Sequence, residues 1–518
     1  MIRIFRGMLG FGVLLAAAGS AQAGRDPAAE AVLDTNCVAC HERDQNGELP
    51  RINAVRKTPE GWQLTIRRMK QWHAITPTPA DERTLVKYLS DTQGLAPEEA
   101  APYRAVVERR PGNIETADDA DINVYCARCH SYARAALQRR DTAEWVKHVH
   151  MHLGQWPTLE YQASGRDREW FKVASTDIAK KLGEKWPLKT SAWAAWQRHK
   201  TADLAGTWRL AGHRPGKGDY SGSLVVKRVG TDLYALSYRL TYADGSTVAG
   251  KGQSILYTGY EWRGATSLGK DKIREIYEVA ADGDSIKGRW FLAQESAIGG
   301  TLRGVRANRP TVLAVSPDHL KAGQSARLTV VGAGLSGKVD LGPGITIEKI
   351  ISNSADTVTV QATAAKDAAV GPRPVAVGSA KAESGLVVYD RVGSVKVEPA
   401  FDIARVGANG GPIAGVPAQF EAVAYTADGL RIGVVPASWS IDNFDKDAVE
   451  AGDAAFGGRI TPVGLFVPAG AGPNPARKGA NNAANLTVKA KVTDGTETIE
   501  GDGHLIVTLQ RWNDAPLR

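Results

Sequence analysis

The spacing of apolar residues changes once along the chain and divides it into two parts. In the first part apolar side chains recur at helical intervals, most clearly in the segments 58–69 and 141–152. Each segment opens with residues that favour a helix start, with Thr58 in the first and Asp141 or Thr142 in the second as the capping residue. Both segments are therefore predicted to be capped helices.

From about residue 204 the apolar spacing becomes alternating, which is typical of strands. Alternating runs such as 221–229, 234–242 and 273–279 are punctuated by the Asp-Gly pairs at 244–245 and 282–283, and such pairs close tight hairpins. We predict an antiparallel β-barrel over residues 201–307. Trp262 and Trp290 lie on these strands and are assigned to its core, where tryptophan on a strand most often packs.

Two further β units follow the predicted barrel. Residues 308–391 open with Val-Ser-Pro and an alternating run, which resembles the start of the immunoglobulin-like IPT/TIG modules. Residues 392–518 contain strand patterns at 420–425 and 486–492, with Asp-Gly hairpin signals, and are predicted to form a sandwich. None of the three β units carries a hydrolase or phosphate-binding motif, so we assign them to scaffold and subunit contact.

Composition places the chain among soluble multidomain proteins. It has 518 residues, 43% of them hydrophobic and 23% charged, and this length exceeds what one core serves. The formal charge of +8 is spread without a basic block, so no nucleic-acid partner is expected. Residues 1–23 combine Arg3 and Arg6, an apolar run and the ending Ala-Gln-Ala, which predicts a signal peptide. The mature chain is expected in a bacterial periplasm, without a membrane anchor.

All four cysteines fall in two copies of one motif. Cys37 and Cys40 precede His41, and the same C-x-x-C-H spacing recurs at 126–130. Two thiols at this spacing reach both vinyl groups of a haem, and the next histidine binds the iron. A redox disulfide or half a zinc site is the competing interpretation of one motif, but two copies favour haem c. The second motif contributes Cys126, Cys129 and His130.

A low-spin iron needs a second axial ligand, and the two predicted helices supply candidates. Met69 lies seven residues after Trp62, and His152 lies seven residues after Trp145. Seven residues are two helical turns, so each candidate shares a face with its tryptophan. We predict Met69 for the first haem and His152 for the second. His73 remains an alternative to Met69, and the alternatives to His152 are His148, His150 and Met151.

These observations define a multidomain architecture of α plus all-β type. A helical di-haem cytochrome c domain over 24–200, with lobes at about 24–110 and 111–200, precedes three antiparallel β-barrel or immunoglobulin-like sandwich domains. Methionine ligation raises the potential of the first haem relative to the bis-histidine second haem, so electrons are expected to flow toward the first haem.

The order of motifs resembles one family, the α (cytochrome) subunit of quinohaemoprotein amine dehydrogenase. The resemblance rests on both C-x-x-C-H motifs, on E-G-W followed by Met69 and His73, and on the stretches 152–162 and 166–170, after which the β domains follow. It implies a periplasmic heterotrimer with a seven-bladed β-propeller subunit and a small subunit that carries cysteine tryptophylquinone. The complex would deaminate primary amines oxidatively, and this chain would pass the electrons to azurin or a c-type cytochrome.

Two other classes of function fit part of the pattern. A di-haem cytochrome c peroxidase would need an iron whose distal position is open, and peroxidases of that type lack three β domains. A stand-alone periplasmic electron relay would use the β domains to hold another partner. Because this chain has no cysteine outside its haem motifs, a cysteine-derived quinone is expected in a partner subunit and not here. No catalytic residue is predicted in this chain.

Overall fold

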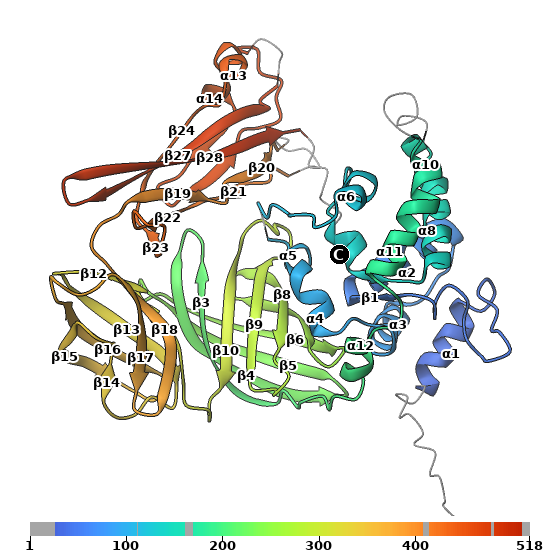
Figure 1. The fold of residues 1–518 in the computed structure, drawn as a ribbon, viewed down its shortest axis with the longest axis horizontal. Coiled ribbons are helices and arrows are strands. Elements are labelled where there is room, and N and C mark those ends of the chain that lie inside the picture. The colour runs from blue at the N-terminus through green and yellow to red at the C-terminus, as the bar shows by residue number, and fades with distance from the viewer. Residues whose placement is uncertain (1–25, 111, 161–168, 408–413, 478–480, 510–518) are drawn as a thin grey trace, which may run out of the picture.

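The computed structural model describes residues 26–110, 112–160, 169–407, 414–477 and 481–509. A helical domain is followed by three β domains, as predicted from the sequence (Figure 1). The predicted leader at 1–23 lies outside these residues. Within the described ranges, no helix is long and apolar enough to cross a membrane.

The helical domain consists of short helices, and both predicted capped helices are present. In α2 the Thr58 side chain accepts a hydrogen bond from the Gly61 amide, and in α8 Asp141 accepts from Glu144. Trp62 and Trp145 are both buried. The helices are α1 (Pro27–Asn36), α2 (Pro59–His73), α3 (Pro79–Thr92), α4 (Pro97–Ala100), α5 (Arg104–Val107), α6 (Ala120–Cys126), α7 (Ala133–Ala136), α8 (Thr142–Gln155), α10 (Trp170–Val173), α11 (Ala179–Lys185) and α12 (Ser191–Trp196).

The second domain is a closed barrel in which each strand pairs with its neighbour in sequence and β10 returns to β3. All its pairs are antiparallel, and Trp262 and Trp290 lie in its core together with Trp208, which confirms their assignment to packing. The strands are β3 (Gly206–Arg214), β4 (Gly218–Gly230), β5 (Leu233–Tyr242), β6 (Thr247–Tyr257), β7 (Glu261–Leu268), β8 (Asp271–Val279), β9 (Ser285–Leu292) and β10 (Gly299–Arg306).

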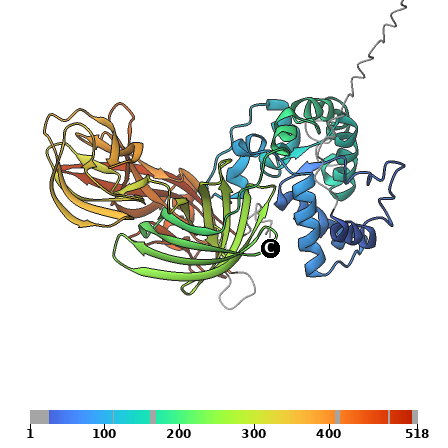
Figure 2. The same ribbon diagram turned by 90° about the horizontal axis from the view of Figure 1, so that it is seen from below.

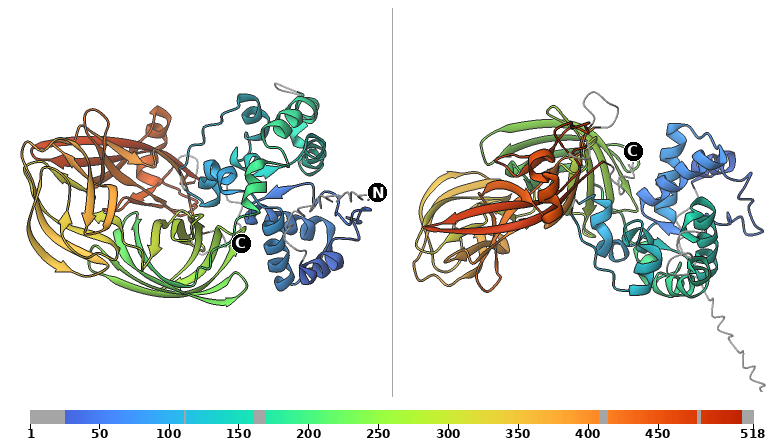
Figure 3. Two further views of the ribbon diagram at one scale, coloured as in Figure 1. Left: turned by 60° about the horizontal axis from the view of Figure 1, so that its bottom comes forward. Right: turned by 90° about the horizontal axis from the view of Figure 1, so that it is seen from above.

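The helical domain lies against one side of this barrel, as the turned views show (Figures 2 and 3). Polar contacts join the two: Arg263 Nε on β7 donates to Glu60 at 2.6 Å, and Lys87 Nζ on α3 lies 2.9 Å from Asp232. The Thr258 amide donates to an Asp91 carboxylate oxygen at 2.7 Å. These contacts come from both α2 and α3, so the first lobe is fixed on the barrel.

The third domain contains two four-stranded sheets, and the described residues of the fourth form one four-stranded and two three-stranded sheets. The third domain comprises β11 (Thr311–Ser316), β12 (His319–Lys321), β13 (Ser325–Ala333), β14 (Val339–Asp340), β15 (Ile345–Asn353), β16 (Thr357–Ala364), β17 (Gly371–Val377) and β18 (Ala380–Tyr389). The fourth comprises β19 (Ser394–Glu398), β20 (Phe401–Arg405), β21 (Ala418–Gln419), β22 (Glu421–Tyr425), β23 (Arg431–Val435), β24 (Ser438–Asn443), α13 (Lys446–Ala451), α14 (Asp453–Phe456), β25 (Gly458–Ile460), β26 (Leu465–Pro468), β27 (Ala484–Asp494) and β28 (Glu497–Thr508).

One expectation about these two domains is corrected. They were predicted to be antiparallel throughout, but β12 pairs parallel with β18, and β20 pairs parallel with β28. The alternation of apolar and polar residues is the same in either direction, so it carries no information on strand polarity. Each parallel pair joins an early strand of its domain to the last one, a long-range pairing that hairpin signals do not describe.

The segment that joins the two lobes is held by the β domains. Arg289 on β9 donates to the carbonyl oxygens of Glu108 at 2.9 Å and Arg109 at 2.7 Å. Gly112 has a φ of +63°, and a Cβ there would lie 2.1 Å from the Cβ of Pro399 in the fourth domain. Only glycine satisfies both the left-handed backbone and this close approach. The lobe linker is therefore clamped between the second and fourth domains.

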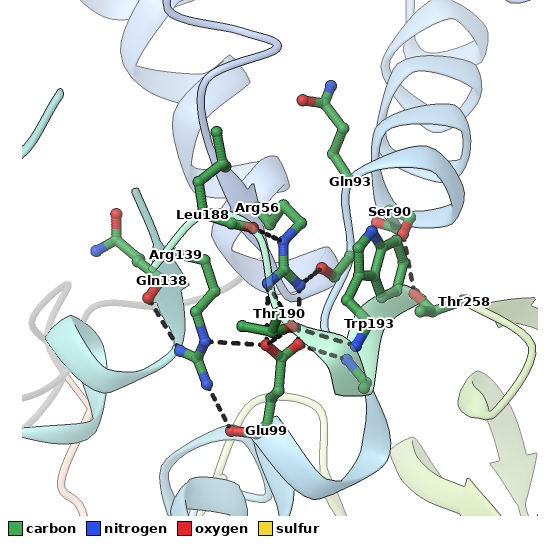
Figure 4. Close-up of polar contacts among 12 residues, drawn as sticks. Arg56, Ser90, Gln93, Glu99, Gln138, Arg139, Leu188, Thr190, Trp193 and Thr258 are labelled. Atoms are coloured by element: carbon green, nitrogen blue, oxygen red, sulfur yellow. Dashed lines mark hydrogen bonds and ion pairs between the residues drawn. The ribbon is translucent and has the colours of Figure 1, made fainter. Parts of the chain in front are cut away.

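The two lobes also meet directly. Strand β1 (Arg56–Lys57) pairs antiparallel with β2 (Gln138–Arg139), which sets Arg56 opposite Arg139. Glu99 on α4 lies between these arginines: both Arg56 terminal nitrogens donate to its carboxylate, at 2.8 and 2.9 Å, and Arg139 Nε donates at 3.2 Å (Figure 4). Thr190 adds a fourth hydrogen bond at 2.8 Å. One buried carboxylate thus links elements of both lobes.

Candidate functional site

The first C-x-x-C-H motif forms a turn directly after α1. Cys37 is the C-cap of that helix, and the His41 amide donates to the Cys37 carbonyl at 2.9 Å. His41 Nδ1 lies 2.9 Å from the Pro50 carbonyl oxygen. An imidazole whose Nδ1 donates to a carbonyl is left with Nε2 free to bind a metal, which is the usual arrangement of metal-binding histidines.

The second motif repeats this arrangement at the end of α6, which finishes at Cys126. His130 Nδ1 lies 2.9 Å from the Ser131 carbonyl oxygen, so its Nε2 is likewise available to a metal. All four cysteines are free thiols, and the second cysteine of each motif, Cys40 or Cys129, is exposed. Two separated helix ends therefore present the same set of thiols and imidazole.

The thiol environments argue against a redox disulfide. Burial and the charge of Asp34 raise the pKa of Cys37 to about 11, and burial with the charge of Asp119 raises the pKa of Cys126 to about 12. Disulfide exchange requires a thiolate, which the surroundings of Cys37 and Cys126, the first thiol of each motif, disfavour at neutral pH. A shared zinc site also finds no support, because no three His, Cys, Asp or Glu side chains gather within the described ranges.

Helix α8 brings His152 to the second motif. The ring centres of His130 and His152 are 6.2 Å apart. Two imidazoles that bind one metal ion from opposite sides, with metal–nitrogen bonds of ~2 Å and ~1.1 Å from nitrogen to ring centre, have centres ~6.2 Å apart. The spacing of this pair therefore fits an iron between the two rings, and the residues present fit the second haem.

The alternatives to His152 are placed differently on α8. The His148 ring packs 5.7 Å from Trp145 and 5.6 Å from His152. His150 is exposed, with its ring 4.9 Å from Phe171, and Met151 is half-buried. Burial, assisted by the positive neighbours His130, Arg68 and Arg134, lowers the pKa of His152 to about 4. The imidazole is then neutral at physiological pH, the form that binds metals.

On the first lobe, α2 carries both Met69 and His73. Met69 is half-buried, whereas His73 is exposed and is the last residue of the helix. A ligand that must reach an enclosed iron is better served by the half-buried side chain, so the structure favours Met69. Its pairing with His41 stays a prediction.

Sequence reasoning missed a group of basic residues beside these helices. Lys57 and Arg140 are 3% and 4% exposed, and Arg68 is half-buried next to Met69. Isolated basic residues in a sequence are assigned to the surface, where most lie. One residue of the sequence could have indicated the buried lysine, namely Gly61 in the motif E-G-W. A Cβ on Gly61 would lie 2.9 Å from the Cβ of Lys57, so glycine makes room for the lysine side chain. We call Lys57, Arg68 and Arg140 the basic cluster.

Fold and site together define a haem protein in which a helical haem-binding domain is carried by three β domains. Four protein-family models match the sequence of this chain. They are described as quinohemoprotein amine dehydrogenase A, alpha subunit, haem binding (27–193), and as alpha subunit domains II (201–307), III (309–390) and IV (395–517). The chain therefore belongs to the family of quinohemoprotein amine dehydrogenase alpha subunits. Part of the motif stretch 152–170 lies outside the described residues.

Other comparisons add little. No curated protein matched the chain. Among solved structures, a redesigned beta barrel, mFAP1, bound to DFHBI has 15% identity over 20% of this chain and 91% of its own, with a TM-score of 0.18. SGBP-B of Bacteroides ovatus, in complex with a mixed-linkage heptasaccharide, has 10% identity over 58% of this chain and 61% of its own, with a TM-score of 0.19. Such low scores establish nothing about function.

Proposed function

We propose that this chain is the di-haem electron-transfer subunit of a periplasmic quinohaemoprotein amine dehydrogenase. It would take electrons from the quinone of a partner subunit, after oxidative deamination of a primary amine, and pass them to azurin or a c-type cytochrome. The observation that carries this proposal is the second site, where His130 of a C-x-x-C-H motif faces His152 at the spacing of two axial imidazoles. Family membership supports the same function.

Each haem would be held by one motif and one helix. Cys37 and Cys40, then Cys126 and Cys129, would form the thioether links, and His41 and His130 would be the proximal ligands. Met69 on α2 and His152 on α8 would complete the two irons. The bound haems supply reversible one-electron oxidation and reduction, and the chain's own residues fix the ligands and exclude water around them.

The catalytic quinone would lie outside this chain. A cysteine tryptophylquinone needs a cysteine of its own, and all four thiols here are assigned to haem links. The partners would be a small quinone-bearing subunit and a β-propeller subunit. The leader at 1–23 and periplasmic location belong to the same proposal. We also propose immunoglobulin-like sandwiches for domains three and four, supported by their paired sheets.

Amine-dependent reduction of the haems tests whether a partner subunit oxidises the amine while this chain only transfers the electrons. The purified chain should accept electrons from an artificial donor and deliver them to azurin or cytochrome c, yet stay oxidised when mixed with primary amines alone. Adding the quinone-bearing partner should restore haem reduction by amine. Amine-driven reduction of the single chain, shown by mass spectrometry to be free of any small subunit, would contradict the proposal.

A di-haem peroxidase remains the second candidate, and the His130–His152 pair argues against it for the second haem. A peroxidatic iron needs an open or releasable distal position, whereas the His152 ring lies 6.2 Å from that of His130, a spacing that fits a second ligand to the same iron. Turnover of hydrogen peroxide by the isolated chain would favour the peroxidase. Co-purification of a small protein that stains for quinone redox cycling would favour the amine dehydrogenase over both the peroxidase and a stand-alone relay.

A further inference from the structure

The basic cluster concentrates positive charge in the interior of the helical domain. Lys57 is 3% exposed and its Nζ donates to Thr65 Oγ1 at 2.7 Å. Arg68 lies one turn after Thr65 on α2, and one of its terminal nitrogens approaches the same hydroxyl oxygen at 3.4 Å. Two cations thus share one neutral hydroxyl, which itself donates to the Gly61 carbonyl at 2.9 Å. One hydroxyl cannot satisfy the donors of a buried ammonium and a guanidinium together.

Arg140, from the second lobe, adds a third charge. It is 4% exposed, and its Nε has no hydrogen-bond partner although the side chain lies over the Trp145 ring, 5.5 Å from the centre. One terminal nitrogen donates to Gln138 Oε1 at 3.1 Å. The Nε of Arg68 is also buried without a partner. Charged donors left unsatisfied in an interior are costly unless an anion meets them.

Glu144, whose negative charge acts on Arg140, also has two other cationic partners. Glu144 lies 3.0 Å from Arg51 Nε and 2.5 Å from Lys147 Nζ. Burial, followed by the charges of Arg140, Arg68 and Arg51, holds the pKa of Lys57 well below its ordinary value. The electrostatic neighbours of Lys57 are therefore positive, as expected for a site that needs an anionic ligand.

The cluster lies beside the second histidine pair. Arg140 lies over the Trp145 ring, whose centre is 5.7 Å from that of His148. The His148 ring in turn lies 5.6 Å from that of His152. The charge of Arg68 also acts on His152, and the charge of Lys57 acts on His148. A haem between His130 and His152 would carry two carboxylates on its edge. These are the only anionic groups of that cofactor, and Arg binds carboxylates with paired hydrogen bonds.

We propose that the basic cluster binds the carboxylates of the second haem, so that residues of both lobes hold one cofactor. This inference rests on the proposed function, because it requires the second haem. It makes Lys57 and Arg68, which belong to the first lobe, ligand-binding residues for the haem of the second lobe. The unpartnered donors of Arg68 and Arg140 would be satisfied by the haem carboxylates.

Resonance Raman spectra and redox titrations test the proposal on the full chain. The variants are Lys57→Gln and Arg140→Gln, with Arg67→Gln as a matched control, because Arg67 is an exposed arginine on the same helix. We expect the carboxylate bending vibrations of the haems to shift in both test variants and not in the control. The midpoint potential of the bis-histidine haem should fall, because a lost cation favours the oxidised iron, while that of the other haem stays unchanged.

The outcomes separate the inference from the proposed function. A haem count below two in the unmodified protein, measured as the pyridine haemochrome, would defeat the proposed function and the inference with it. Two haems with unchanged carboxylate vibrations in the variants would overturn only the inference, even if the potentials shift through charge alone. A shift confined to the methionine-ligated haem would overturn the assignment to the second haem. If a buried substitution prevents folding, the half-buried Arg68→Gln gives the same test.

Discussion

Glu99 is the residue on which the joint between the lobes depends. Burial alone would raise the pKa of its carboxyl group, but the hydrogen bonds and charge of Arg56, with the charge of Arg139, lower the pKa to about 2. The ordinary value is 4.5, so folding stabilises the ionised form. A shift of this size corresponds to about 3 kcal/mol of stability, present above pH 4.5 and lost as the pH falls toward 2.

We expect Glu99→Gln to destabilise the helical domain by about 3–5 kcal/mol, because it leaves two buried arginines facing each other without an anion. Denaturant unfolding followed by haem absorbance measures this loss. Glu98→Gln, next to it on α4, is the control and should change stability little. A Glu99→Gln protein as stable as the unmodified chain would show that the arginines find other partners.

The axial ligands give a second prediction at this scale. In Met69→Ala the oxidised protein should lose the methionine–iron charge-transfer band in the far red, because that band requires a thioether ligand. In His152→Ala the second haem should lose its low-spin spectrum. Absorption and magnetic circular dichroism measure both effects.

Neighbouring residues on α8 provide the controls for these substitutions. Met151→Ala and His150→Ala change the same residue types without removing a predicted ligand, and both should keep the parent spectra. A Met69→Ala protein that retains the far-red band, or a His152→Ala protein that remains fully low-spin, would contradict the corresponding assignment.

At the scale of single residues, predictability from sequence depended on how local the signal was. The two C-x-x-C-H motifs are contiguous, so the thiols and histidines of the proposed haem sites could be read directly from the sequence. His152 could be proposed as a ligand because a helix repeats its faces, so that His152 shares a face with Trp145, and the structure places its ring 6.2 Å from that of His130. The burial of Lys57 and Arg140 could not be predicted, because it depends on contact between lobes that lie far apart in sequence.

At the scale of elements, a hydrogen-bond network around His213 and Asp219 connects three β domains. His213 on β3 lies 2.6 Å from Asp219 on β4 and 2.6 Å from Glu421 on β22 of the fourth domain. Ser316 on β11 of the third domain donates to the same Asp219 at 2.6 Å. Burial would lower the pKa of His213, but the two carboxylates raise the pKa to about 10. The imidazolium form is therefore the partner of both acids.

We expect the contact between the barrel and the fourth domain to weaken in alkali. The ordinary pKa of His213 is 6.5, so its contribution to stability is complete below that pH and is lost as the pH rises toward 10. Limited proteolysis between pH 6 and 10 should show increasing cleavage near the domain junction. In His213→Gln the cleavage should be high at pH 6 and vary little with pH, whereas His199→Gln should behave like the parent chain.

The elements themselves were predictable where their signals are local. The capped starts of α2 and α8 follow from Thr58 and Asp141, and alternation located the long strands of the barrel. The two-residue strands β1 and β2 were not predictable, because two residues carry no periodicity and their pairing joins distant segments. The parallel pairing of β12 and β20 was not predicted either, because the alternation of apolar and polar residues is the same for both strand directions.

At the scale of the whole molecule, the order of one helical and three β domains followed from the change of apolar spacing near residue 204. The contacts between domains did not follow, because they rest on single side chains such as Arg263 and Arg289 that no pattern distinguishes from surface arginines. The alpha-subunit family could be inferred from motif order alone, since that order spans the full chain.

A deletion of residues 392–518 tests the scaffold role of the fourth domain. Its core is separate from those of the helical domain, so both haem spectra should persist while co-purification of the quinone-bearing partner falls. Size-exclusion chromatography with absorbance at the haem band measures both quantities together. Loss of either haem spectrum with partner binding intact would contradict the assignment of this domain to assembly.

The clamp on the lobe linker has a consequence for tunnelling between the cofactors. Electron tunnelling slows exponentially with distance, so a hinge that opened even slightly between two haem-bearing lobes would make the rate fluctuate. Arg289 donates to the linker from the second domain, and Pro399 of the fourth domain lies so close to Gly112 that no side chain fits between them. In the proposed scheme the β domains carry no redox group. They would fix the distance between the two haems, and with it the tunnelling rate, while partners bind and leave.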